Sequence, residues 1–132
     1  MKTKDVKRAF ADNYLIRAEE CLRAAEGSLQ KNDWNAAAIC AVHGCISAGD
    51  ALCVHFLEKR HAGDNHKEAM TLLKSINPES DVYLNQANRF SRVLGIKHMA
   101  EYEKRLVFRI EAERALKDCE RFVAFVKEEL GK

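Results

Sequence analysis

Apolar residues recur every three or four positions along most of the chain, and this spacing decides what the chain can fold into. Between Asp5 and Lys31 the successive intervals are 4, 3, 4, 3 and 4, which keeps the apolar side chains on one face of an α-helix and fits no β-strand. The stripe consists of Ala11, Leu15, Ala18, Leu22, Ala25 and Leu29. The pattern therefore predicts an amphipathic helix.

The same spacing returns in four further segments, and no strand pattern competes with it. The predicted helices run from Trp34 to about Arg60, from His66 to Ile76, from Asp81 to about Leu94, and from about Glu101 to Leu130. Asp33 and either Ser80 or Asp81 are candidate N-caps, and Gly63 occupies the expected stop position of the second helix. Short turns make sequential helices antiparallel neighbours. We predict an all-α, antiparallel up-and-down helical bundle of four long helices plus one short helix, forming a single domain over residues 1–132.

Composition excludes several classes of protein. With 47% hydrophobic and 32% charged residues the chain is globular rather than disordered. The net charge of +2 neither requires nor excludes a nucleic-acid partner. No apolar run of 18 residues is present and the charged N-terminus is followed by no apolar segment, so we expect no membrane span and no secretion. Five cysteines within helical patterns suggest reduced thiols in a cytoplasmic protein.

Two short motifs resemble chemical sites without their usual context. The stretch "GSLQKND" is similar to a nucleotidyltransferase signature, but its Gly27 and Ser28 lie within a helical stripe. Cys40, His43 and Cys45 have a spacing that a zinc site could use, yet Cys45 belongs to an apolar stripe and no paired CxxC is present. We therefore predict no metal, no cofactor and no intrachain disulfide.

Most of the distinctive chemistry lies in "SRVLGIKHMAEYEKR", residues 91–105. At about 100° per residue, Arg92 lies about 200° from the core position Phe90, so it points away from the core, and Arg89 lies about 100° from it. His98 follows Gly95, where the helix is expected to end.

Lys97, Tyr102 and Arg105 bring further polar groups to the same corner of the predicted structure. A guanidinium can hold a phosphate in a bidentate contact, and an imidazole can transfer a proton near neutral pH. The residues alone leave two interpretations open, a solvated helix corner and a site for phosphodiester chemistry in which His98 and Arg92 act together.

An arginine and a histidine separated by five residues ("VLGIK"), near the end of the penultimate helix of a small bundle, resemble the motif of the HEPN domain family. The alanine-rich first helix pair, "NHKEAMTLL" and "KHMAEYEKR" are also similar to parts of that family. The resemblance covers nearly the whole chain and implies a symmetric homodimer in which two such motifs meet across a cleft.

The resemblance also implies functions for individual residues. Arg92 and His98 are the candidate catalytic residues of a metal-independent endoribonuclease, as in toxins of toxin–antitoxin pairs, with RNA or nucleotides as ligands and a small nucleotidyltransferase as an antitoxin partner. Candidate binding residues for nucleic acid or nucleotide are Arg89, Lys97, Tyr102 and Arg105. Val93 and Ala100 differ from the residues of active members. The alternative is therefore a non-catalytic helical interaction or scaffold module that binds a protein partner.

Overall fold

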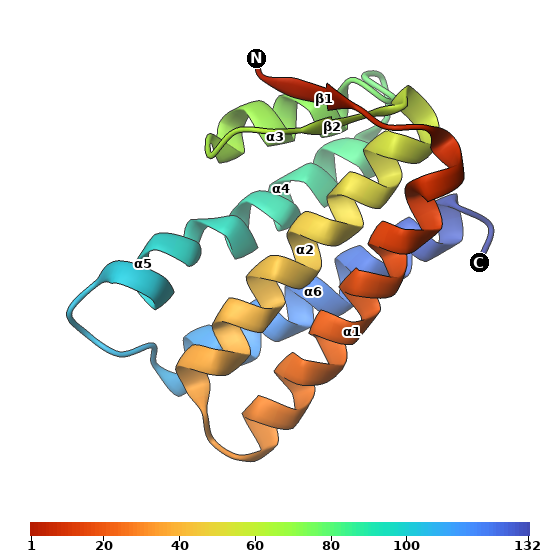
Figure 1. Ribbon diagram of the computed structural model, residues 1–132. Coiled ribbons are helices and arrows are strands. Elements are labelled where there is room, and N and C mark those ends of the chain that lie inside the picture. Colours follow the sequence, from red (N-terminus) through yellow and green to blue (C-terminus); the bar gives the residue numbers. More distant parts are fainter.

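The computed structural model describes residues 1–132 and is mostly helical, which confirms the predicted all-α class. Its helices, shown in Figure 1, are α1 (Ala11–Gln30), α2 (Trp34–Leu57), α3 (His66–Lys74), α4 (Asp81–Gly95), α5 (Lys97–Tyr102) and α6 (Arg109–Glu129). A 3-10 turn (Arg8–Phe10) precedes α1. Two short strands, β1 (Thr3–Asp5) and β2 (Lys59–His61), complete the fold.

Helix α2 forms the centre of the molecule and contacts every other α-helix. Two glycines allow its neighbours to approach closely. A Cβ added at Gly44 would lie 3.0 Å from Sγ of Cys119 on α6, and one at Gly49 would lie 3.0 Å from Cε2 of Phe90 on α4. Small residues on this helix therefore fix how near α4 and α6 pack, as expected for close helix–helix contacts.

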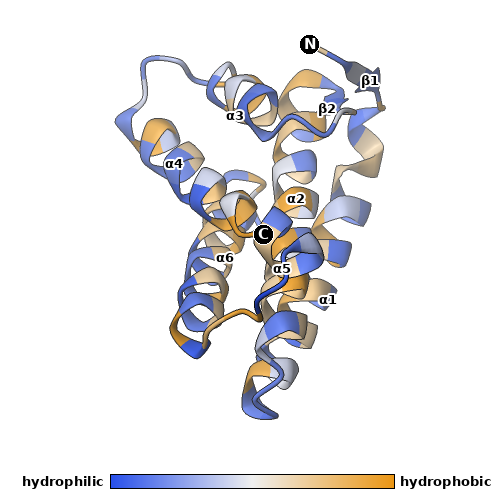
Figure 2. Cartoon of the chain, turned by 90° about the vertical axis from the view of Figure 1, so that its left-hand side faces the viewer, coloured by the Kyte–Doolittle hydropathy of each residue, from blue (hydrophilic) through white to orange (hydrophobic).

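The apolar faces of the helices are directed toward one another, as the hydropathy colouring in Figure 2 shows. One large buried cluster joins α1, α2, α3, α4 and α6. Phe122 is fully buried, and its ring centroid lies 5.3 Å from that of Phe90. Cys45, Cys53 and Cys119 belong to this cluster, where a free thiol packs as a small hydrophobic group.

Helix α2 is more apolar than expected from the sequence. Its 24 residues are long and apolar enough to cross a membrane, which corrects the expectation that no such stretch exists. However, 67% of its most apolar window is buried inside the protein. This burial is typical of the core helix of a soluble protein.

The two strands were not predicted. They pair antiparallel, with Thr3 opposite His61 and Asp5 opposite Lys59, and the ribbon lies across the ends of α1 and α2 near α3 (Figure 1). Helix α2 also ends earlier than expected. Glu58, and not Gly63, adopts the left-handed conformation that terminates it, with φ of 53°.

The last predicted helix is two helices. The sequence predicts one helix from Glu101, whereas α5 ends at Tyr102 and α6 begins only at Arg109. Residues 103–108 form a connection anchored by Val107, which is buried and whose backbone N–H donates to Oδ1 of Asn35 at 2.9 Å. This contact with α2 takes the place of the helical hydrogen bond that a continuous helix would make.

Candidate functional site

Two grooves border the junction of α4 and α5, and Gly95 lines both. The first, of about 740 Å³, lies between the α4–α5 region and α6. We call it the basic groove because five basic side chains line it. These are Arg92, Arg105, Arg114, Lys117 and Arg121. Three acidic residues also line this groove, namely Glu111, Glu113 and Asp118.

The second groove, of about 670 Å³, lies between α2, β2, the start of α3, α4 and α5. We call it the histidine groove because four of the five histidines of the chain line it. These are His43, His61, His66 and His98. Both grooves have the size of ordinary small-molecule sites.

Arg92 lies in the basic groove and is exposed, as its angular position on the helix predicts. Its side chain is 58% exposed. It donates from Nη2 to Oδ1 of Asp118 at 3.3 Å and from Nε to Oδ2 at 3.4 Å. These contacts are long for a bidentate pair between a guanidinium and a carboxylate. Arg92 is therefore paired in the free protein but remains open to solvent.

Arg89 lies one turn earlier on α4 and shares the same carboxylate. Its Nε is 3.4 Å from Oδ1 of Asp118, and its side chain is less exposed than that of Arg92. Arg89 also donates to the side chain of Gln86 at 3.1 Å. Asp118 thus faces two guanidinium groups at once. No local pattern in the sequence marks Asp118 as a site residue, because only the packing of α6 against α4 brings it there.

His98 lies in the other groove. Its side chain is 74% exposed, and its Nε2 is 3.0 Å from Oε1 of Glu103. Tyr102, one turn later on α5, has its ring centroid 5.6 Å from that of His98, and Lys97 lines the same groove. The expectation that Arg92 and His98 share one volume within a single chain is therefore wrong, since the two side chains line different grooves.

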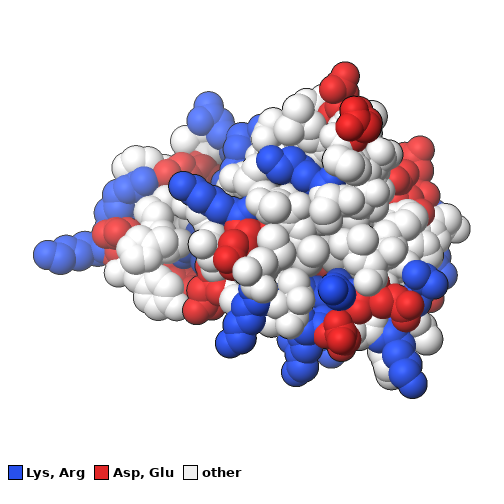
Figure 3. Space-filling view, turned by 90° about the horizontal axis from the view of Figure 1, so that it is seen from above, with Lys and Arg blue, Asp and Glu red and all other residues white.

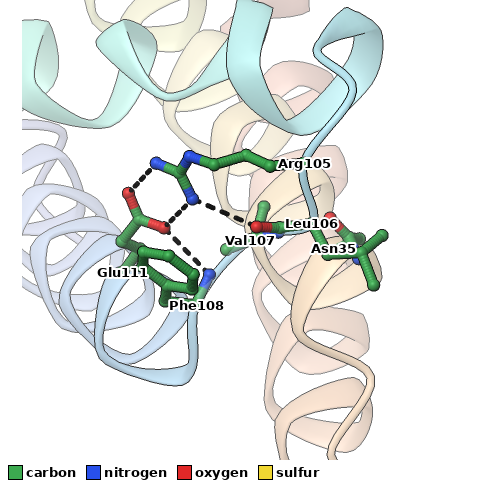
Figure 4. Close-up of polar contacts among 6 residues, drawn as sticks. All are labelled: Asn35, Arg105, Leu106, Val107, Phe108 and Glu111. Atoms are coloured by element: carbon green, nitrogen blue, oxygen red, sulfur yellow. Dashed lines mark hydrogen bonds and ion pairs between the residues drawn. The ribbon is translucent and has the colours of Figure 1, made fainter.

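Arg105 lies in the basic groove and clamps the connection between α5 and α6 (Figure 4). Its Nη1 and Nη2 donate to the two carboxylate oxygens of Glu111, both at 2.8 Å, and Nη1 also donates to the carbonyl of Leu106. Glu111 in turn accepts from the backbone N–H of Phe108 at 2.8 Å. The Arg105 hydrogen bond and then that of Phe108 lower the pKa of Glu111 to about 2.

This clamp leads to a prediction about the mobility of the connection. Glu111→Gln removes the carboxylate that holds Arg105 and the Phe108 N–H. We expect hydrogen exchange of the Phe108 amide to accelerate by roughly tenfold, because a charge-assisted bond limits its opening. Hydrogen exchange measured by NMR tests this, with Glu113→Gln, two residues further along α6, as the control. An unchanged rate at Phe108 would contradict the importance of the clamp.

Asp50 is the least expected residue of the histidine groove. It is partly buried on α2, on the same face as His43 and Ile46, and its carboxylate makes no hydrogen bond or ion pair within the protein. Burial raises the pKa of this carboxyl to about 7, in spite of the lowering effect of Arg60 and Arg17. Two histidines of this groove lie near glutamates of other elements, His43 3.6 Å from Glu101 and His61 3.5 Å from Glu68.

No group of three or more His, Cys, Asp or Glu side chains is arranged to hold a metal ion. The groups that remain for chemistry are the guanidinium groups of the basic groove and the carboxyl, imidazole and phenol groups of the histidine groove. They can bind anions, accept N–H donors and transfer protons.

Comparison with known proteins supports the fold. No family model matches the chain, and no curated protein matches it. A crystal structure that resembles it is that of TT1696 from Thermus thermophilus, with a TM-score of 0.71 and 24% sequence identity. The superposition covers 90% of this chain and 97% of that chain. At this identity the likeness shows that the two chains share a fold.

Proposed function

We propose that the chain is a HEPN-like homodimer that binds the phosphate groups of RNA or nucleotides, with Arg92 as the principal contact. The observation that carries the proposal is the basic groove, where five basic side chains face three acidic ones around an exposed guanidinium. The face of the molecule seen from above in Figure 3, in contrast, shows both signs of charge interspersed. A local excess of positive charge in a concave site attracts polyanions.

The shared carboxylate leaves Arg92 able to bind phosphate. Asp118 compensates only one unit of positive charge, and it lies between two arginines. The more buried Arg89 has the greater need of that carboxylate, because an unpaired charge costs more free energy where water is excluded. Arg92 is therefore the guanidinium that is free to exchange its long contacts for a phosphate oxygen.

The dimer completes the site in this proposal. Within one chain Arg92 and His98 line different grooves, so joint action on one phosphodiester requires a second subunit. Large apolar side chains are exposed beside this region: Leu106 is 72% exposed, Phe108 60% and Ile110 50%. Contiguous exposed apolar residues are typical of interaction sites, and a two-fold arrangement would place this surface against its own copy.

The proposed function includes a ribonuclease activity and a protein partner. His98 would accept the proton of a ribose 2′-hydroxyl, and Arg92 would stabilise the charged phosphorane, which requires no metal. A cytoplasmic toxin of a toxin–antitoxin pair, with a small nucleotidyltransferase as antitoxin, is the role that the HEPN resemblance implies. Lys97, Tyr102 and Arg105 would contact the RNA on either side of the scissile phosphate.

The second candidate function is a non-catalytic scaffold that binds a protein partner. The exposed apolar residues of the connection favour it, because the clamp between Arg105 and Glu111 holds them in a fixed conformation. A preorganised apolar surface lowers the entropic cost of binding a protein. Such a module would bind no RNA through Arg92.

RNA binding by an Arg92→Ala variant tests the proposal. We expect the variant to bind a short single-stranded RNA roughly tenfold more weakly, because a charge-assisted contact to phosphate is lost. The slope of log K against log salt concentration should fall by about one unit. Fluorescence anisotropy at several salt concentrations measures both quantities.

The matched control is Arg23→Ala. Arg23 is exposed on α1, makes no ion pair within the protein and lines neither groove. Both variants lose the same charge, so only Arg92→Ala should lose affinity beyond the general electrostatic effect. Equal losses in the two variants would show that Arg92 has no special contact with phosphate.

A further inference from the structure

The carboxylate of Asp50 is a polar group without a partner in the wall of a concave site. It reaches the histidine groove from α2, it makes no hydrogen bond or ion pair with the protein, and the apolar side chains of Ile46, Phe90 and Leu94 line the groove with it. Polar groups in such surroundings normally have partners. A carboxylate left open in a groove is therefore suited to a ligand that donates hydrogen bonds.

The rest of the groove restricts the chemistry of that ligand. Lys97 lines it on α5, the helix that carries Tyr102, and favours an anionic group at that end of the ligand, whereas Arg60 lies on β2 and acts on the Asp50 carboxyl. The exposed ring of Tyr102, 72% open to solvent, offers a flat face beside His98 on which a planar ring can stack. The ligand should thus combine an anion, a planar ring and adjacent N–H donors.

We infer that the histidine groove is a guanine-binding site in which the Asp50 carboxylate accepts the N1–H and N2–H donors of a guanine nucleotide. Guanine places these two donors side by side, so both can reach one carboxylate, which accepts hydrogen bonds and donates none when ionised. Adenine places an acceptor, N1, in the equivalent position and would repel the carboxylate. The phosphate of the guanine nucleotide would lie toward Lys97, and its ring against Tyr102 on the same helix.

This inference rests on the proposed function and makes it more specific, since His98 lines the same groove. A homodimer that cleaves RNA would then act next to guanine. Asp50 is in this view a specificity-determining residue and takes no part in proton transfer.

The experiment compares GMP and AMP at pH 8 by isothermal titration calorimetry. At this pH the Asp50 carboxyl, with its pKa of about 7, is mostly ionised. We expect wild-type protein to bind GMP roughly tenfold more tightly than AMP, the loss expected when a pair of hydrogen bonds to a charged group is not made. Asp50→Asn should remove this preference and leave the affinity for AMP within about twofold.

Asp64→Asn is the matched control, because Asp64 lines the same groove but is exposed. It should retain the preference for GMP. Equal affinities of the wild type for GMP and AMP, a preference that survives Asp50→Asn, or no binding of GMP would overturn the guanine site. If the guanine site is overturned but RNA still binds through Arg92, the proposed phosphate-binding function stands without the guanine site. If RNA binding is also absent, the guanine site and the proposed function both fail.

Discussion

His98→Ala is expected to reduce the RNA cleavage that we propose for a homodimer about 100-fold to 10,000-fold, which is the range for removal of a general base. The fold should be unaffected, because the His98 side chain is 74% exposed and its only ion pair is with Glu103, which is itself half exposed. Incubation of wild type and variant with mixed RNA in the presence of EDTA measures the rates. Cleavage by the wild type should not respond to EDTA.

His43→Ala provides the control for this experiment. His43 lines the same groove, is about half exposed and has a glutamate partner of its own. The control should cleave at nearly the wild-type rate. Equal cleavage by wild type and His98→Ala would indicate a contaminating nuclease and reject the role of His98. A wild type that binds RNA but does not cleave it would limit the function to phosphate binding.

Asp50→Asn is expected to increase the free energy of unfolding, and the increase should depend on pH. Burial raises the pKa of Asp50 to about 7 in the folded protein, against an ordinary value near 4 in the unfolded chain. At low pH the carboxyl is protonated in both states and costs nothing. As pH rises from about 4 to 7 only the unfolded chain loses the proton, so the wild type becomes less stable.

The expected difference follows from the size of this pKa shift. Asn carries no charge at any pH, so the variant should be more stable than the wild type by up to about 4 kcal/mol at pH 8 and by about 1.5 kcal/mol at pH 5. Urea denaturation followed by circular dichroism at both values measures this difference. Asp64→Asn, which removes an exposed carboxylate, should show little change. An Asp50→Asn variant less stable than the wild type at pH 8 would contradict the burial of an unpaired carboxylate.

The helices that carry a complete apolar stripe could be predicted from the sequence because local periodicity determines them. Ser80 caps α4 as expected, its Oγ accepting from the backbone N–H of Tyr83. The strands could not be predicted, since residues 3–5 and 59–61 lack an alternating pattern and pair only through tertiary structure. The break before α6 was also missed. No Gly or Pro marks it, and it depends on the distant contact of Val107 with Asn35.

The candidate site was predictable only where a local property of the sequence determines it. The exposure of Arg92 follows from its angle to the core stripe, which is a local property. Its pairing with Asp118, 26 residues further along the chain, depends on which helices pack together. The separation of Arg92 from His98 depends on the direction of α5. Asp50 could not be predicted as a site residue, because a single acidic residue among the apolar residues of α2 forms no recognisable pattern.

The wall shared by the two grooves has a consequence for regulation. Gly95 borders both, and a side chain at this position would meet nothing within 4 Å, whereas the next residue, Ile96, lines the basic groove and packs against both buried clusters. A ligand that shifts α5 from the histidine side changes the free energy of occupancy on the basic side. Thermodynamic linkage makes such an effect reciprocal, so each ligand would alter the affinity for the other by the same factor.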